Sequence, residues 1–122
     1  MALFNLRSKG AEAPTTPALG AFLEGASIEV MPRTAEKIAS FAEILPAGTR
    51  VYVAHIEGTP IDDMVATARR ITDEGFAVMP HIPARIIEDR VELETWLKRY
   101  RTEAGVAQAL VLAGGVAKPV GA

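Results

Sequence analysis

The sequence predicts an α/β fold in which four parallel strands alternate with three helices in the order βαβαβαβ. Four short apolar runs recur about 25 to 30 residues apart, which is a spacing typical of βαβ units. The runs are mostly continuous rather than alternating, as is typical of parallel strands buried on both faces. The stretches between them carry apolar residues at helical spacing. The four runs span residues 28–31, 51–56, 76–82 and 109–112.

The amino-terminal part of the chain precedes this pattern. Residues 1–17 have no periodicity and contain two prolines, so we expect a mobile arm there. A short helix is expected over residues 18–24, where Gly25 would end it. Residues 18–122 then form one domain.

Each of the three helices between the strands has a start signal and a stop signal. Pro60 fits the first position of the second helix, and Glu92 lies three residues after the capping residue of the third, as in a capping box. The expected starts and stops are Thr34 to Pro46, Thr59 to Gly75 and Asp89 to Gly105. The apolar faces are Ile38, Phe41, Ile44 and Leu45 in the first helix, Ile61, Met64, Val65, Ala68 and Ile71 in the second, and Leu93, Trp96, Leu97, Tyr100 and Ala104 in the third.

Two architectures use this order of elements, a doubly wound open sheet and the (β/α)8 or TIM barrel. The barrel typically takes about 250 residues, and the chain has 122. We therefore predict half of a barrel, with its first four strands and three helices. Helices on one side of four strands leave the inner face uncovered. We expect either that the chain is a piece of a longer protein that holds the second half, or that further copies fill the face in a homo-oligomer.

Composition excludes several classes of protein. The net charge is -2, from 13 Lys plus Arg and 15 Asp plus Glu, and no stretch is a basic block, which argues against nucleic-acid binding. The absence of cysteine excludes disulfides and thiolate metal sites. No apolar run approaches the roughly 20 residues of a membrane span, and the amino terminus lacks a signal-peptide core. We expect a cytoplasmic protein with no membrane partner and no metal.

Residues that could carry chemistry occur once per strand, and ligands gather at the carboxyl ends of strands in both architectures. Glu29 lies inside the first apolar run, where a desolvated carboxyl would keep its proton near neutral pH and act as a general acid. His55 and His81 end the second and third runs. Gly114 and Gly115 follow the fourth, where glycine lets a backbone approach a ring or a phosphate.

Each of these residues also has a plain structural interpretation. Glu29 could sit on an edge strand and point to solvent, or pair with a basic residue. Each histidine could be a hydrogen-bonded structural residue, and the two glycines an ordinary turn. Glu29 with both histidines could in principle form a two-His-one-carboxylate metal set, which we regard as the least favoured interpretation.

Three segments resemble the methylenetetrahydrofolate reductase family, in the family's order and spacing. Residues 27–34, SIEVMPRT, are similar to its first-strand segment SFEFFPPRT. Residues 80–84, PHIPA, are similar to its PHLTC segment. Residues 105–115, which end in LVLAGG, are similar to its GI…ILALRGD segment. The resemblance covers about residues 27–121, which correspond to the first half of the family's catalytic barrel.

The resemblance implies a flavin-dependent oxidoreductase of one-carbon metabolism. The family is a TIM-barrel flavoprotein that uses FAD and a reduced nicotinamide to reduce 5,10-methylenetetrahydrofolate to 5-methyltetrahydrofolate. Glu29 matches its general acid, which assists opening of the folate's five-membered ring to an iminium cation that accepts hydride. His81 matches a flavin-contacting histidine, His55 falls where the family has a flavin-side threonine, and Gly114 matches the glycine of LRGD.

The sequence departs from the family at several of these positions. Ala113 replaces the Arg of LRGD and Gly115 replaces its Asp, which lies near the flavin and the folate; Pro83 and Ala84 replace the Thr-Cys pair. A divergent member with another electron donor or folate fits these changes. Two alternatives remain open: a non-catalytic half-barrel that serves as an assembly or regulatory subunit of a folate or methyl-transfer enzyme, and another barrel enzyme that binds a phosphate-bearing ligand at Gly114-Gly115.

Overall fold

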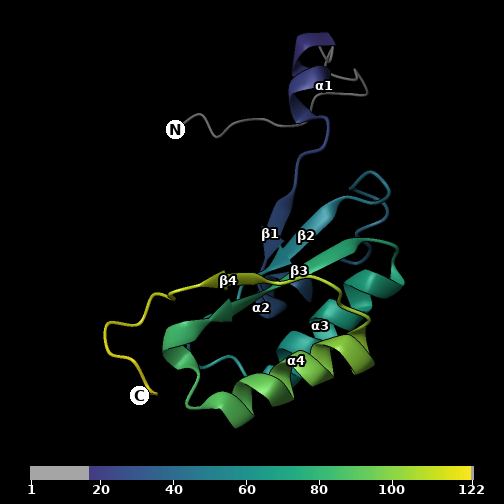
Figure 1. The fold of residues 1–122 in the computed structure, drawn as a ribbon. Helices are drawn as coiled ribbons and strands as arrows, with labels where there is room; N and C mark the ends of the chain where they lie inside the picture. The colour runs from purple at the N-terminus through teal and green to yellow at the C-terminus, as the bar shows by residue number, and fades with distance from the viewer. Residues whose placement is uncertain (1–16, 122) are drawn as a thin grey trace, which may run out of the picture.

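A computed structural model describes residues 17–121, and the mobile arm predicted for residues 1–17 lies, except for Pro17, outside them. The observed order alternates short helices with parallel strands (Figure 1). The elements are α1 (Pro17–Leu23), β1 (Ile28–Val30), α2 (Pro32–Ala35), β2 (Arg50–Val53), α3 (Ile61–Asp73), β3 (Ala77–Pro83), the 3-10 turn η1 (Ala84–Ile86), α4 (Arg90–Ala104) and β4 (Leu110–Leu112).

The strands form one four-stranded sheet in the order β1-β2-β3-β4, and every neighbouring pair is parallel. The predicted α/β fold with a parallel sheet is therefore confirmed. Strand neighbours in the sheet are neighbours in sequence, without the reversal of order that defines a doubly wound sheet. Helices α3 and α4 pack against each other and lie on the same side of the sheet (Figure 1).

The core lies between the sheet and these two helices. Alternate strand residues such as Val51, Val53 and Val78 point toward the helices and are buried. From the helices, Met64 and Ile71 of α3 are fully buried. Other members of the same cluster include Val30, Phe41, Val65, Ala68, Phe76, Ile82, Trp96, Tyr100 and Ala104.

The other face of the sheet is not covered by any helix among residues 17–121. On this face Glu29 is exposed, and Tyr52 and Met79 are half-buried. The described residues thus leave one face of the sheet without helices, as predicted for four strands with helices on one side, and they do not themselves bury the strands on both faces. The apolar runs are continuous because Tyr52 and Met79 lie on the open side, as apolar as the residues that face the core.

Helices α3 and α4 confirm the predicted second and third helices. Asp89 is the N-cap of α4, and its side chain accepts a hydrogen bond of 2.8 Å from the Glu92 N–H. Gly105 ends α4 in the left-handed conformation, with φ 65°. Helix α3 starts one residue later than predicted, because Pro60 rather than Thr59 is its N-cap.

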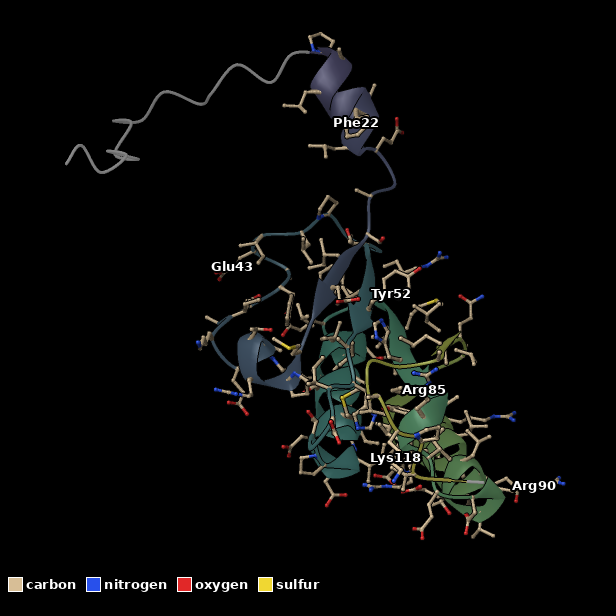
Figure 2. The ribbon with its side chains drawn as sticks, turned by 90° about the vertical axis from the view of Figure 1, so that its left-hand side faces the viewer. Phe22, Glu43, Tyr52, Arg85, Arg90 and Lys118 are labelled. Atoms are coloured by element: carbon tan, nitrogen blue, oxygen red, sulfur yellow. The ribbon has the colours of Figure 1, made fainter. Side chains whose placement is uncertain are left out.

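Helix α1 confirms the predicted amino-terminal helix to within one residue. All of its residues are exposed, and Phe22 is 82% exposed. Figure 2 shows α1 standing apart from the sheet, joined to β1 by an extended segment.

The predicted helix between β1 and β2 is wrong. Only the four residues of α2 are helical there, and residues 36–49 form turns. Thr34 lies inside α2 rather than before it, and its hydroxyl accepts a hydrogen bond of 2.9 Å from the Met31 N–H. The apolar side chains still reach the core, because Phe41 is fully buried and Ile38 and Leu45 pack against the cluster.

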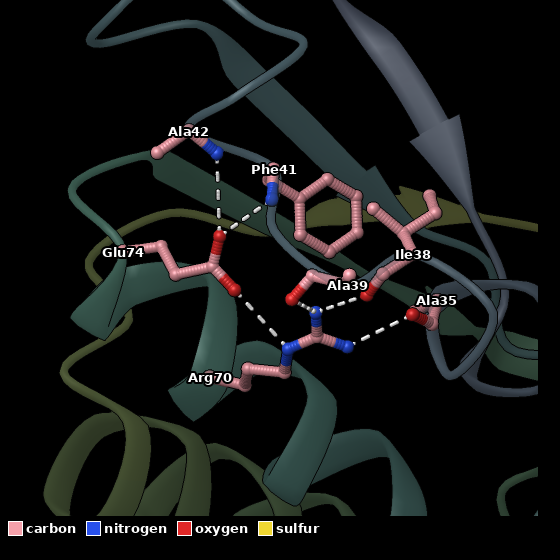
Figure 3. A network of polar contacts seen from close by, with 7 residues as sticks. All are labelled: Ala35, Ile38, Ala39, Phe41, Ala42, Arg70 and Glu74. Carbon is pink, nitrogen blue, oxygen red and sulfur yellow. Dashed lines mark hydrogen bonds and ion pairs between the residues drawn. The ribbon is translucent and has the colours of Figure 1, made fainter.

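The side chains of Arg70 in α3 and of Glu74, the residue that caps the carboxyl end of α3, replace the helical hydrogen bonds of this segment (Figure 3). One Glu74 oxygen accepts from the N–H groups of Phe41, at 2.6 Å, and Ala42, at 3.3 Å. The Arg70 guanidinium donates to the backbone oxygens of Ala35, Ile38 and Ala39, and also pairs with Glu74 at 3.1 Å.

Arg70 also lies over the Phe41 ring, 5.2 Å from its centroid. The turns after α2 are therefore specified by residues more than 30 positions away in the sequence, which helical periodicity does not reveal.

We predict that the network formed by Arg70 and Glu74 stabilises the fold more than the adjacent ion pair between Arg69 and Asp73 does. Glu74→Ala leaves the partly buried Phe41 N–H without its acceptor and should lower the free energy of unfolding by about 1–3 kcal/mol. The matched control is Asp73→Ala, which removes an exposed pair with Arg69, with side chains 65% and 69% exposed. It should change the free energy of unfolding by less than about 0.5 kcal/mol. Urea unfolding of both variants measures this, and equal losses would contradict the interpretation.

Candidate functional site

The open face of the sheet brings together residues from three strands. The register places Glu29 of β1 opposite Tyr52 of β2, and Tyr52 opposite Met79 of β3. His81 lies two residues beyond Met79 and therefore on the same face. Along the sheet, His81 is paired with Leu110 of β4. The face thus carries one carboxylate and one imidazole on a largely apolar surface.

Glu29 and His81 meet across β2, although their strands are not neighbours. The distance from Glu29 Oε2 to His81 Nε2 is 3.1 Å. The His81 side chain is 10% exposed and the Glu29 side chain 58% exposed. The contact is within ion-pair distance but lacks hydrogen-bond alignment, so His81 Nε2 is buried without a hydrogen bond among the described residues. The Glu29 carboxylate lies against this nitrogen, so its realignment would be needed to complete a hydrogen bond.

Tyr52 completes the group. Its ring meets the His81 ring edge-on, with centroids 6.3 Å apart and planes at 64°, so it supports one side of the imidazole. Figure 2 shows Tyr52 on the strand side of the molecule, away from the helices. Our sequence interpretation did not include Tyr52. The alternation of strand residues could have identified Tyr52. It lies between Val51 and Val53, which both face the helices, so its own side chain must point to the other face.

The expected burial of Glu29 is not observed. We expected a carboxyl desolvated by an apolar strand, but its neighbours Ile28 and Val30 point to the opposite face while Glu29 points to the open one. Water therefore reaches Glu29 in the described chain. The feature that distinguishes it from other surface carboxylates is the buried imidazole 3.1 Å away.

His55 does not join this group. Its ring packs against Trp96 of α4, with centroids 4.9 Å apart, and its Nε2–H donates to the Thr59 carbonyl at 2.9 Å. The Nδ1 atom is buried without a partner among residues 17–121. Burial lowers the pKa of His55, and the hydrogen bond to Thr59 offsets this only in part. His55 is therefore held as a neutral residue of the sheet–helix layer.

The two glycines have different surroundings. Gly114 has φ 92°, and a side chain on it would meet Pro83 of β3 at 3.1 Å, so local backbone conformation and close packing both favour glycine there. The turn is held to the segment after β3 by the Arg85 N–H, which donates to the Ala113 carbonyl at 3.0 Å. Gly115 faces open space.

The residues described here do not form a metal site. Among residues 17–121, no group of three or more His, Asp or Glu side chains converges as metal ligands. The separation of His55 from Glu29 and His81 explains why the two-His-one-carboxylate arrangement is not formed.

A cavity of about 680 Å³ lies at the amino-terminal edge of the sheet, and Glu29, Tyr52 and His81 are not among its lining residues. It is bordered by residues 23–28 and 45–50 and by Ala77. In parallel α/β folds this edge serves stability while the carboxyl edge carries ligands. We therefore place the candidate site at Glu29 and His81 rather than in this larger space.

No family model matches the chain. Within residues 17–121, the helices are too short or too polar to cross a bilayer. Chemically, a solvent-facing carboxylate in contact with a buried imidazole is a pair that can transfer a proton.

We predict that His55 makes stability depend on pH. Because its folded-state pKa is lowered, the unfolded state binds more protons below pH about 6.5. The free energy of unfolding should therefore fall as pH drops through that value, until the folded-state pKa is passed. His55→Gln retains a side-chain N–H for Thr59 and removes the titration. Urea unfolding of both proteins between pH 7 and 5 measures this: the difference between them should change with pH, and a constant difference would contradict the prediction.

Proposed function

We propose that the chain supplies the first half of a (β/α)8 barrel of a methylenetetrahydrofolate reductase-like enzyme. The reaction is the flavin-dependent reduction of 5,10-methylenetetrahydrofolate to 5-methyltetrahydrofolate. The sequential strand order β1-β2-β3-β4 supports a barrel over a doubly wound sheet. Such a barrel needs four more strands, which we assign to a second copy or to another polypeptide segment. The chain alone is then inactive.

The contact between Glu29 and His81 carries this proposal. The resemblance assigns one residue to acid catalysis and the other to the flavin, and they come from different strands. The structure brings them to 3.1 Å, on the face that turns inward when strands in this order close into a barrel.

The residues present fit a flavin in two respects. His81 Nε2 has no hydrogen bond within the described chain, so it can bond the polar edge of a flavin ring once Glu29, 3.1 Å away, turns aside to admit the ring. Gly115 leaves open space where a side chain would stand, so a planar group can approach the backbone. FAD bound there would supply the hydride. The Asp that the family has at position 115 is absent, so its contacts to flavin and folate must be replaced or lost.

In this proposal Glu29 delivers a proton to the folate. The carboxyl O–H protonates a nitrogen of the five-membered ring as its bond to the methylene carbon breaks, and that electron pair stays on nitrogen. Glu29 becomes a carboxylate and the methylene carbon an iminium carbon. Because Glu29 is exposed in the described chain, it needs a cover to hold its proton. The bound folate and the remaining strands supply that cover, since loss of water favours the neutral carboxyl.

The rival function is a non-catalytic half-barrel that serves as a subunit of a folate or methyl-transfer enzyme. Ala113 and Gly115, which replace the family's Arg and Asp, favour it. Flavin content separates the two. The protein isolated in its natural assembly should be yellow and should bind added FAD with quenching of flavin fluorescence. A colourless protein that binds no FAD would rule out the reductase, and its isolation with a folate or methyl-transfer enzyme would favour the rival.

A second prediction concerns the acid. In the assembled enzyme, Glu29→Gln should lower folate reduction by about 10²–10⁴-fold, the usual contribution of a general acid, while nicotinamide oxidation by the flavin persists. The control is Glu43→Gln, because Glu43 is an exposed carboxylate on the turns after α2, remote from the site (Figure 2). It should leave both half-reactions unchanged. Equal loss of both half-reactions in Glu29→Gln would show that Glu29 acts on flavin binding or folding instead.

A further inference from the structure

A second cavity opens at the carboxyl edge of the sheet, between α2 and the loop from β2 to α3. Its volume is about 440 Å³. Met31, Pro32 and Ile56 form apolar parts of its wall, and Met31 and Ile56 are 37% and 52% exposed. It lies at the edge where parallel α/β folds bind ligands. None of the sequence-predicted site residues lines it.

The cavity is also lined by two cations, Arg33 and Lys37. Arg33 lies in α2 and Lys37 in the turn that follows it, and both border the same cavity. Neither forms an ion pair with a carboxylate within residues 17–121. Glu57 is on the opposite side of the same cavity, but it also forms no ion pair there.

This arrangement contrasts with the helical arginines of the same chain. Four of them pair with a carboxylate one turn further along their helix: Arg69 with Asp73, Arg70 with Glu74, Arg90 with Glu94 and Arg99 with Glu103. At the same spacing, Arg33 is followed by another cation instead of an acid. Arg33 and Lys37 therefore line the cavity without a carboxylate partner within residues 17–121.

We propose that this cavity binds an anionic group, a phosphate or a carboxylate, attached to an apolar body. The anion lies between Arg33 and Lys37, where it forms charge-assisted hydrogen bonds. The apolar body covers Met31 and Ile56. Gly58 at the rim has φ 84° and open space at its Cβ position, so no side chain of its own closes the entrance. The site is independent of the reductase proposal, because it uses neither Glu29 nor His81.

The test is titration of the whole chain with two probes, inorganic diphosphate and triglutamate, followed by two-dimensional ¹H–¹⁵N NMR. Sodium chloride at matched ionic strength is the control for screening. We expect saturable shifts of the backbone amides of residues 31–37 and 56–59, weakening as salt increases. Binding of diphosphate alone identifies a phosphate ligand, and binding of triglutamate alone identifies a carboxylate ligand. Saturable binding of both supports a site that recognises charge.

Three substitutions test the charges. The double variant Arg33→Gln with Lys37→Gln should weaken binding by about tenfold, since each exposed ion pair contributes modestly. Glu57→Gln should strengthen it, because a facing carboxylate repels the anion. Lys98→Gln is the matched control: Lys98 is exposed on α4 and does not line the cavity, so binding should not change.

Four results would overturn the site. They are no saturable shift up to about 10 mM of either probe, shifts located elsewhere on the chain, an equal loss of affinity in Lys98→Gln, and weaker binding in Glu57→Gln. Dispersion of the variant spectra shows whether each variant is folded. If the double variant does not fold, the location of the shifts in the unaltered chain decides the question.

Discussion

One-sided burial of the parallel sheet is the constraint on which the rest of this structure depends. Strand residues alternate between two faces, and only the face toward α3 and α4 is covered by helices within residues 17–121. Val51, Val53 and Val78 therefore supply the core, while the residues between them point the other way. The position of Glu29 next to His81 follows from this alternation, because both residues point away from the helices on strands whose register is set by the core.

Helix α3 links this core to the turns that follow α2. Its apolar side packs Met64 and Ile71 against the strands, and its polar side holds the segment after β1 through Arg70 and Glu74. These charged side chains are only partly exposed, and they bond backbone groups that would otherwise lack partners. The same helix thus fixes the strands and also the turns that carry the chain from β1 to β2.

What could be predicted from the sequence was local. Helix α4 was predictable because Asp89 and Gly105 act within a few residues of its ends. The turns after α2 were not, because their apolar residues have helical spacing while their backbone partners come from Arg70 and Glu74. Glu29 and His81 could be singled out from the sequence, whereas Tyr52 was missed and His55 was grouped with them although it packs against Trp96. The geometry of the site was not predictable, because the continuous apolar runs concealed which face each residue occupies.

The two histidines show how much depends on that choice of face. His55 continues the series Val51 and Val53, so its ring enters the helix layer and stacks on Trp96. His81 continues from Met79 on the open side, where it meets Glu29. In this sheet, the histidine an even number of residues from the buried valines of its strand, His55, faces the helices and is structural. The histidine an odd number of residues away, His81, faces the open side and meets Glu29.

The same reasoning applies to the acid itself. Glu29 owes its position to the strand, but its readiness to hold a proton depends on whatever covers the open face. Any layer that excludes water there would strengthen the interaction between Glu29 and His81, since charges interact more strongly at low dielectric. It would also favour the neutral carboxyl through desolvation. These two effects oppose each other, so the geometry of the covering layer, and not strand β1 alone, decides whether Glu29 serves as a proton donor or as the anion of an ion pair.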